Sequence, residues 1–150
     1  MKKKSIIVAL VMIFSVLSFS GCTKIIQKIK DPISPSGFTD IAKELGLEAE
    51  TQSATDEMEV YVASDDNISL SYYIYNNIDD VESGYSYIEN YLKGFFEESQ
   101  YEIDEDNKFC AINDTQKVYL LRDRNVIIYL FSTSNDYNDR LDTAADKLGF

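Results

Sequence analysis

The stretch that decides the fold is MEVYVASDDNISLSYYIY, residues 58–75. In both 58–63 and 68–75, side chains of two kinds alternate with a period of two residues. Such a period places neighbouring side chains on opposite faces of a strand. The sequence between the two runs, Ser-Asp-Asp-Asn at 64–67, consists of residues that favour turns. We therefore predict a β-hairpin with one buried face.

Helical spacing on either side of this hairpin predicts helices at 35–46 and 78–98. The first follows a Ser-Pro pair suited to a helix start and ends at Gly46, while Asn77 can cap the second. The polar residues 48–56 indicate a loop. The predicted buried stripes are Phe38, Ile41, Ala42 and Leu45 in the first helix, and Val81, Tyr85, Ile88, Leu92 and Phe95 in the second.

The C-terminal part predicts three more strands, at 108–113, 116–122 and 125–132, and a last helix at 135–148. The run 126–131 is apolar at every position, which is typical of a central strand. Helices and strands interleave with turns of hairpin length, which favours an α+β fold. We predict three helices and a mostly antiparallel five-stranded sheet, in the order α-β-β-α-β-β-β-α, as one acidic domain over 36–150.

The N-terminus has the features of an export signal. Lys2, Lys3 and Lys4 precede an apolar run at 6–19, and Ser20 and Gly21 lead to Cys22. This end resembles the lipobox of bacterial lipoproteins, with Phe19 where that family usually has Leu. The resemblance implies a signal peptide at 1–21, diacylation of Cys22, a tether at 22–35, and a protein anchored by lipid on the extracytoplasmic side of the cell membrane.

Two alternatives to lipidation remain at this stage: plain secretion, and an uncleaved membrane helix. The apolar span at 5–21 has 17 residues, whereas a spanning helix needs about 20. The body, 36–150, also resembles small uncharacterised lipoproteins of clostridia-like Gram-positive bacteria. Shared features are the Leu-Gly ends of the first and last helices, the aromatic hairpin and the long middle helix. This resemblance implies a lipoprotein without an assigned activity.

The charge is strongly asymmetric. All 26 acidic residues lie at Asp31 or beyond, where there are only eight basic residues, so the net charge of 31–150 is −18. Nucleic acid binding needs a basic surface, and anionic lipid repels carboxylates, so both are excluded as partners of the body. The excess of negative charge can serve solubility alone. The alternative is a basic protein partner or a cation.

The chain contains no His and two Cys. The absence of His excludes triads that use imidazole and most zinc sites. If lipid occupies Cys22, Cys110 has no partner for an intrachain disulfide. Cys110 is then either a small buried apolar residue or a reactive thiol.

Tyrosine supplies the candidate binding site. The strand pattern places several tyrosines on one sheet face, opposite Val60, Leu70 and Ile74. Aromatic rings stack on flat apolar surfaces and their hydroxyls form hydrogen bonds, which suits a glycan, an extended peptide or a small ligand. The alternative is that helices cover both sheet faces and the tyrosines are core. The candidate residues are Tyr61, Tyr73, Tyr75, Tyr119 and Tyr129.

Two acidic features are weaker candidates. The sequence Asp-Glu-Asp-Asn at 104–107 offers oxygen ligands for calcium but lacks the Gly and the distal Glu of an EF-hand loop, which favours a solvated turn over a calcium site. Paired carboxylates can also hydrolyse glycosides. We expect no cofactor, no metal and no catalytic activity. The predicted function is a lipid-anchored binding or interaction module of the cell envelope, with a basic protein as its first candidate partner. The alternatives are a binder of wall glycan or another small ligand through the tyrosine-rich sheet face, and a carboxylate hydrolase.

Overall fold

The structure is a computed structural model, and it describes residues 33–150. The predicted signal peptide at 1–21, the lipidation site Cys22 and the tether up to residue 32 lie outside the described residues.

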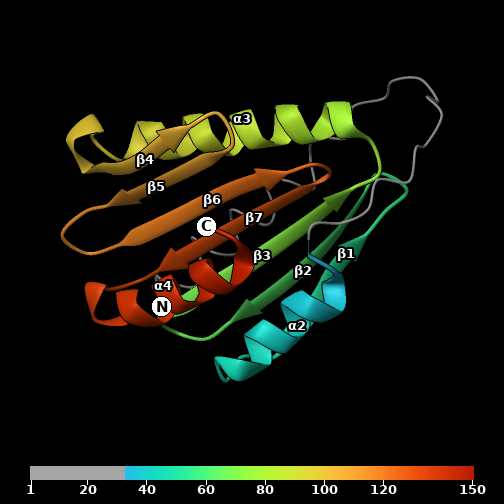
Figure 1. Cartoon of the computed structure of the whole chain (residues 1–150), viewed down its shortest axis with the longest axis horizontal. Helices are drawn as coiled ribbons and strands as arrows, with labels where there is room; N and C mark the ends of the chain where they lie inside the picture. Colours follow the sequence, from blue (N-terminus) through green and yellow to red (C-terminus); the bar gives the residue numbers. More distant parts are fainter. Residues whose placement is uncertain (1–32) are drawn as a thin grey trace.

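Residues 33–150 form one seven-stranded antiparallel sheet with three α-helices, in the order α-β-β-β-α-β-β-β-β-α (Figure 1). The sheet order is β1-β2-β3-β7-β6-β5-β4. Two short 3₁₀ helices, η1 and η2, precede β4 and α4. The elements are α2 (Pro35–Glu44), β1 (Ala49–Ala54), β2 (Met58–Ser64), β3 (Ile68–Tyr75), α3 (Ile78–Phe95), η1 (Glu98–Gln100), β4 (Tyr101–Glu105), β5 (Lys108–Ile112), β6 (Lys117–Asp123), β7 (Val126–Ser132), η2 (Asn135–Tyr137) and α4 (Asn138–Leu148).

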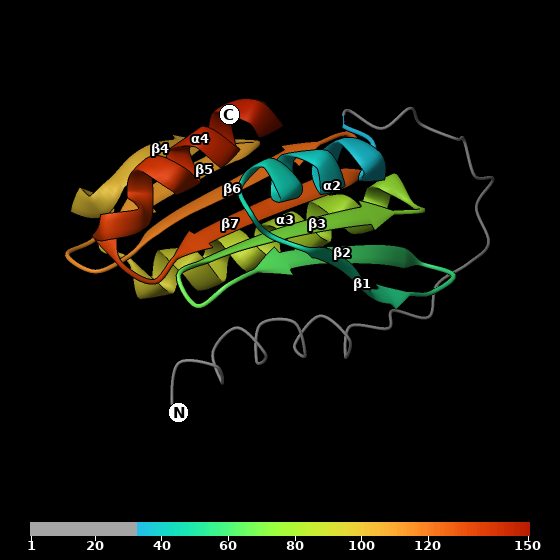
Figure 2. The same ribbon diagram turned by 90° about the horizontal axis from the view of Figure 1, so that it is seen from below.

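The helices lie on both sides of the sheet. Seen along the sheet in Figure 2, α2 and α4 cover one face and α3 lies on the other. Helix α2 contacts β1, β2 and β3, and α4 contacts β7, while α3 contacts β3, β6 and β7. The two sheet faces therefore carry two separate hydrophobic clusters, which we call the α2/α4 core and the α3 core.

The α+β class and the three helices are confirmed, but the five-stranded sheet is wrong. The two additional strands, β1 and β4, are the edge strands. β1 lies in the polar stretch predicted as a loop. β4 begins three residues after the predicted helix 78–98, in a stretch with no predicted element, and extends into the acidic stretch at 104–107. An edge strand gains backbone hydrogen bonds from one neighbour without burying an apolar face, so its sequence need not alternate. Both strands also contain a register shift, a common feature of sheet edges.

The predicted central strand is confirmed. β7 lies fourth of seven strands and pairs with both β3 and β6. Its consecutive residues Ile127 and Ile128 are both buried, one in each core. A strand that is covered on both faces explains why the run 126–131 has no polar position.

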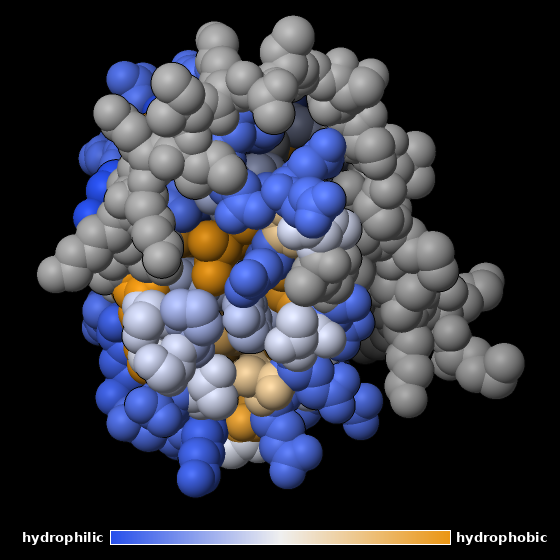
Figure 3. Space-filling view, turned by 90° about the vertical axis from the view of Figure 1, so that its right-hand side faces the viewer, coloured by the Kyte–Doolittle hydropathy of each residue, from blue (hydrophilic) through white to orange (hydrophobic). Residues whose placement is uncertain are grey.

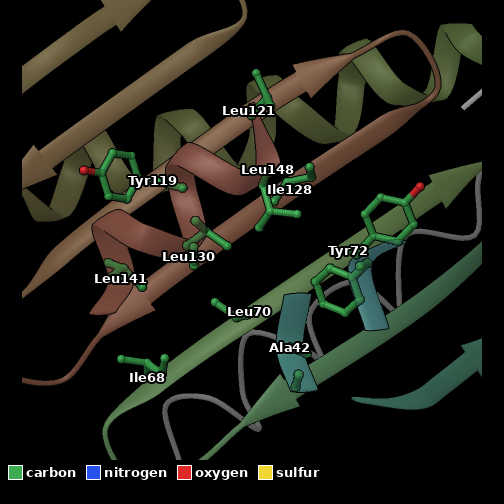
Figure 4. Packing of buried hydrophobic residues seen from close by; sticks show 14 of the residues in the cluster. Ala42, Ile68, Leu70, Tyr72, Tyr119, Leu121, Ile128, Leu130, Leu141 and Leu148 are labelled. Carbon is green, nitrogen blue, oxygen red and sulfur yellow. The ribbon is translucent and has the colours of Figure 1, made fainter. Parts of the chain in front are cut away.

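The α2/α4 core is built from side chains of both helices and the central strands (Figure 4). Leu141 of α4 lies next to Leu130 of β7 and Leu148 lies next to Ile128, while Ala42 of α2 and Tyr72 of β3 belong to the same cluster. Tyr72 also stacks on Phe38 with the ring centroids 5.2 Å apart. Its hydroxyl donates to the backbone carbonyl of Ile33, which fixes the start of α2 against the sheet.

The ends of α2 and α4 confirm the predicted caps. The Ser34 side chain accepts a hydrogen bond from the Gly37 amide, with Pro35 as the first helical residue. Both helices end in left-handed glycines, Gly46 with φ 75° and Gly149 with φ 98°. At this conformation a side chain is strained, so glycine is favoured there.

The end of α3 differs from the prediction. The helix ends at Phe95, and the backbone of Phe96 is extended, with φ −102° and ψ 147°. The extended backbone turns the Phe96 ring into the α3 core, where it is 4% exposed, whereas Phe95 is 57% exposed. The predicted stripe is thus correct from Val81 to Leu92 and wrong at Phe95.

Candidate functional site

The five candidate tyrosines do not share one face, so this part of the prediction is wrong. In the β2–β3 pair, Val60 lies opposite Tyr73 and Tyr61 lies opposite Tyr72. Directly opposed residues share a face. Tyr73, Tyr75 and Tyr129 accordingly belong to the α3 core. Tyr119 lies opposite Leu130 and, like Tyr61, faces α2 and α4.

Burial also limits what these tyrosines can contact. Tyr73, Tyr75, Tyr119 and Tyr129 are buried. Tyr61 is partly buried, and its hydroxyl donates to the Glu59 carboxylate at 2.9 Å. Four of the five rings therefore offer little surface on which a sugar or peptide could stack.

On the α3 side, tyrosine hydroxyls lie close to one another. Burial raises the pKa of Tyr73 to about 12, with Ser71 as a hydrogen-bonding neighbour. Burial also raises the pKa of Tyr129, and the nearby hydroxyls of Tyr73 and Tyr91 raise it further. The phenols of Tyr73 and Tyr129 are therefore neutral at physiological pH. The buried tyrosines of the α3 core therefore carry polar hydroxyls but no charge, which is compatible with a position in the core beneath α3.

Gly84 of α3 allows the helix to approach this cluster closely. The Tyr75 hydroxyl occupies the space that a Cβ on Gly84 would need, and such a Cβ would lie 3.0 Å from Tyr75 Cζ. Such a distance is far shorter than an ordinary contact. Any side chain at this position would push α3 away from β3.

The exposed aromatic residues that the structure describes gather on α3. Tyr87, Tyr91 and Phe95 are spaced four residues apart, so they line one flank of the helix, and they are 42%, 46% and 57% exposed. We call these three residues the α3 stripe. It adjoins the buried side of the helix, because Tyr91 approaches Tyr129. The buried stripe predicted from the sequence left out Tyr87 and Tyr91 but included Phe95, so it did not connect the three residues.

Carboxylates surround the α3 stripe. Asp80 lies on the same flank at the start of the helix, and Glu98 follows its end in η1; both are exposed. On the other flank, Lys93 is bound by Glu89 at 3.3 Å and by Asp104 at 2.6 Å. The positive charge of Lys93 is thus balanced by carboxylates of the same chain. Figure 3 shows the end of the molecule where β3 leads into α3, and its described surface is largely hydrophilic.

The opposite sheet face carries a polar cluster that the sequence did not predict. The buried Lys117 ammonium lies 3.1 Å from Asp142 and 3.2 Å from Glu102, and Tyr119 donates to Asp142 at 2.8 Å. Burial alone would lower the pKa of Lys117, but hydrogen bonds with Tyr119, Asp142 and Glu102 outweigh it and raise the pKa. The Lys117 ammonium therefore stays charged, and its hydrogen bonds are used within the protein. Through Asp142 it connects α4 to the sheet.

Cys110 belongs to the same region. Its thiol is buried and lies 3.3 Å from Glu102 Oε2, to which it donates. Burial, and then the Glu102 carboxylate, raise the pKa of the thiol to about 12. The thiolate is the reactive form, so Cys110 has the properties of a small buried residue.

The acidic stretch 104–107 is split between two elements: Asp104 and Glu105 end β4, and only 106–107 form the turn. Among residues 33–150, there is no group of three or more carboxylate or thiol side chains that could hold a metal ion. In the same range, no helix has both the length and the apolar character that crossing a bilayer requires.

Comparison of the chain with protein-family models, with curated proteins and with solved structures finds no match. The candidate site therefore rests on the geometry of the chain itself, and its most distinctive surface is the α3 stripe.

Proposed function

We propose that the protein is a lipid-anchored, extracytoplasmic module that binds another protein of the cell envelope. The observation that carries this proposal is the α3 stripe, in which three large aromatic side chains are exposed in a row. Exposed apolar patches of this kind usually mark interaction sites, and aromatic residues are enriched in the cores of protein interfaces. The anchor itself rests on the resemblance of residues 1–22 to a lipoprotein signal.

The binding surface in this proposal differs from the tyrosine face inferred from the sequence. Burial of Tyr73 and Tyr129 favours a role for them in the core. The rings of Tyr87 and Tyr91 are accessible, and a glycan could stack on them as well. Protein binding is favoured because Phe95, the most exposed ring of the stripe, has no hydroxyl to serve a sugar.

A catalytic role has less support. The carboxylates of Asp142 and Glu102 accept hydrogen bonds from Lys117, Tyr119 or Cys110. A general acid or base needs a proton that it can exchange with a substrate, whereas these groups are engaged within the protein. We propose that this cluster stabilises the fold.

The experiment that tests the proposed function follows the chain in cells with an affinity tag after Phe150. The wild-type chain is expected in the membrane fraction, labelled by radioactive palmitate, with the tag accessible to added protease. The Cys22→Ala chain is expected without label and outside the membrane fraction. Crosslinking of the wild-type chain is expected to recover an envelope protein. A cytosolic wild-type chain, or an envelope chain that crosslinks to no protein, contradicts the proposal.

A further inference from the structure

We propose that the α3 stripe is the docking surface for a basic amphipathic helix of the partner protein. This inference names the partner class for the binding function proposed above and rests on it. Three features of α3 support a basic helix as the partner: the spacing of the stripe, the charges at its two ends and the ion pairs on the other flank.

The spacing fits a helical partner. Phe95 follows Tyr87 by eight positions in the helix, a rise of about 12 Å at 1.5 Å per residue. Partner helices that dock side by side present apolar residues at positions i, i+4 and i+7, which rise about 10.5 Å and so cover nearly the same length. The stripe has one aromatic ring per helical turn, so each ring can meet one apolar side chain of such a partner.

The charges at the ends of the stripe indicate the sign of the partner's charge. Asp80 precedes Tyr87 by two helical turns on the same flank, and Glu98 follows Phe95 by three residues. Both carboxylates are exposed, and neither forms an ion pair with another described residue. Lys or Arg residues at the two ends of a partner helix would complement them.

The other flank of α3 supports this assignment. There, the ammonium of Lys93 binds Glu89 and Asp104, and Arg122 lies 4.0 Å from Glu82. The carboxylates on that flank are thus paired with cations of the same chain, whereas Asp80 and Glu98 beside the stripe can pair with cations of a partner.

The same charges exclude two other occupants. A second copy of the chain would bring Asp80 and Glu98 toward identical carboxylates, and the net charge of −18 over 31–150 adds a general repulsion. An anionic bilayer repels the stripe for the same reason. A basic helix is the occupant for which both the aromatic row and its acidic ends are favourable.

The test measures binding of a defined probe to the full mature chain in detergent. The probe is a fluorescent 18-residue peptide with Leu along one helical face and Lys at both ends. A matched peptide has Glu in place of every Lys. Tyr91→Ala and Phe95→Ala are the test variants. Ile78→Ala is the control, because Ile78 is 50% exposed on the same helix but on the other flank. Circular dichroism verifies that all three variants keep the wild-type fold.

The basic peptide is expected to bind the wild-type chain, with affinity at least tenfold lower for Tyr91→Ala and for Phe95→Ala and unchanged for Ile78→Ala. Replacing Asp80 by Asn together with Glu98 by Gln should reduce the dependence of binding on salt. The proposal is overturned if the Glu peptide binds equally well, or if Tyr91→Ala and Phe95→Ala bind the basic peptide like the wild type. It is also overturned if these variants instead abolish self-association, vesicle binding or binding of soluble wall fragments.

The same variants separate this inference from the broader function in cells. Loss of the crosslinked envelope protein from a chain with both Tyr91→Ala and Phe95→Ala supports the docking surface. Recovery of the same protein with that chain retains the binding function and overturns the docking surface. If the wild-type chain recovers no protein, the broader function fails, and the peptide measurement alone decides whether the stripe binds a basic helix.

Discussion

The hydroxyl of Tyr75 occupies the space that a Cβ on Gly84 would need, where α3 packs on β3. A methyl group on Gly84 would lie 3.0 Å from Tyr75 Cζ and 3.3 Å from Ile127 Cδ1. We predict that Gly84→Ala lowers the free energy of unfolding by about 1 kcal/mol, because overpacking by about 1–3 kcal/mol outweighs a gain in helix propensity of about 1 kcal/mol. Urea unfolding followed by circular dichroism measures the change.

Gly94 provides the matched control. It lies in the same helix, but no atom comes within 4 Å of a Cβ added there. Gly94→Ala should therefore raise the free energy of unfolding by about 0.5–1 kcal/mol. A second control uses Tyr75→Phe, which removes the atom nearest to Gly84. In that background Gly84→Ala should be less destabilising. Equal effects of the two glycine substitutions would contradict the close packing of α3 on Tyr75.

The buried tyrosines predict a loss of stability at alkaline pH. Burial raises the pKa of Tyr73 to about 12 and also raises that of Tyr75, Tyr85 and Tyr129. In the unfolded chain these phenols ionise near pH 10. A raised folded-state pKa means that the stabilisation is complete below about pH 10 and is lost as pH rises toward 12. At pH 11 the loss is about 1.4 kcal/mol for Tyr73.

Thermal unfolding between pH 8 and pH 11.5 tests this prediction, with absorbance at 295 nm as the measure of tyrosine ionisation. The Tyr73→Phe chain should lose less stability over that interval than the wild type. A midpoint that does not change up to pH 11.5 would mean that these phenols are not buried in the folded protein.

The ion-pair cluster predicts a cost for removing its cation. Lys117→Met keeps the length of the side chain but leaves Asp142 and Glu102 without the ammonium. Both carboxylates are partly exposed, so water compensates in part, and we expect a loss of about 1–2 kcal/mol. In a double-mutant cycle with Asp142→Asn, the combined loss should be smaller than the sum of the separate losses. Additive losses would show that the two side chains do not interact.

Truncation of single tyrosines separates core from surface. Tyr129→Ala should lower the free energy of unfolding by about 3–5 kcal/mol, as removal of a large buried ring does. Tyr91→Ala, half exposed on α3, should change it by less than about 0.5 kcal/mol. Differential scanning calorimetry of the two variants provides the comparison. A small effect of Tyr129→Ala would return that residue to the list of accessible candidates for ligand binding.

The sequence predicted well those features that depend on local chemistry. The cap at Ser34, the glycine ends of α2 and α4, the 68–75 strand and the central strand all follow from residues close in sequence. The sheet face on which each tyrosine lies, in contrast, depends on the register between neighbouring strands. The length of the loop between β2 and β3 sets the register of the two strands, and in that register even-numbered residues of β2 lie opposite odd-numbered residues of β3. Tyr61 and Tyr73 therefore lie on opposite faces of the sheet. Because β3 is buried on both faces along most of its length, the alternation of its side chains could not reveal this register.

The α3 stripe was missed for a different physical reason. An apolar residue at helical spacing predicts burial, and Phe95 fits the spacing of Val81, Ile88 and Leu92. The helix ends at Phe95, however, and the extended backbone at Phe96 gives the core position to the next residue. A helix end cannot be located from the sequence to one residue, and here one residue decides which of two phenylalanines is exposed.

The position of β7 also constrains when the protein can fold. Strands β1–β3 and strands β4–β6 are each consecutive hairpins, and β7 alone joins the two groups by pairing with β3 and β6. While the chain is being synthesised, it contains two incomplete sheets until residues 126–132 emerge. Each of these sheets exposes an apolar edge strand, which is prone to aggregation. The native sheet can therefore form only once β7 is available, and a chain truncated before β7 is expected to remain a substrate for chaperones and proteases.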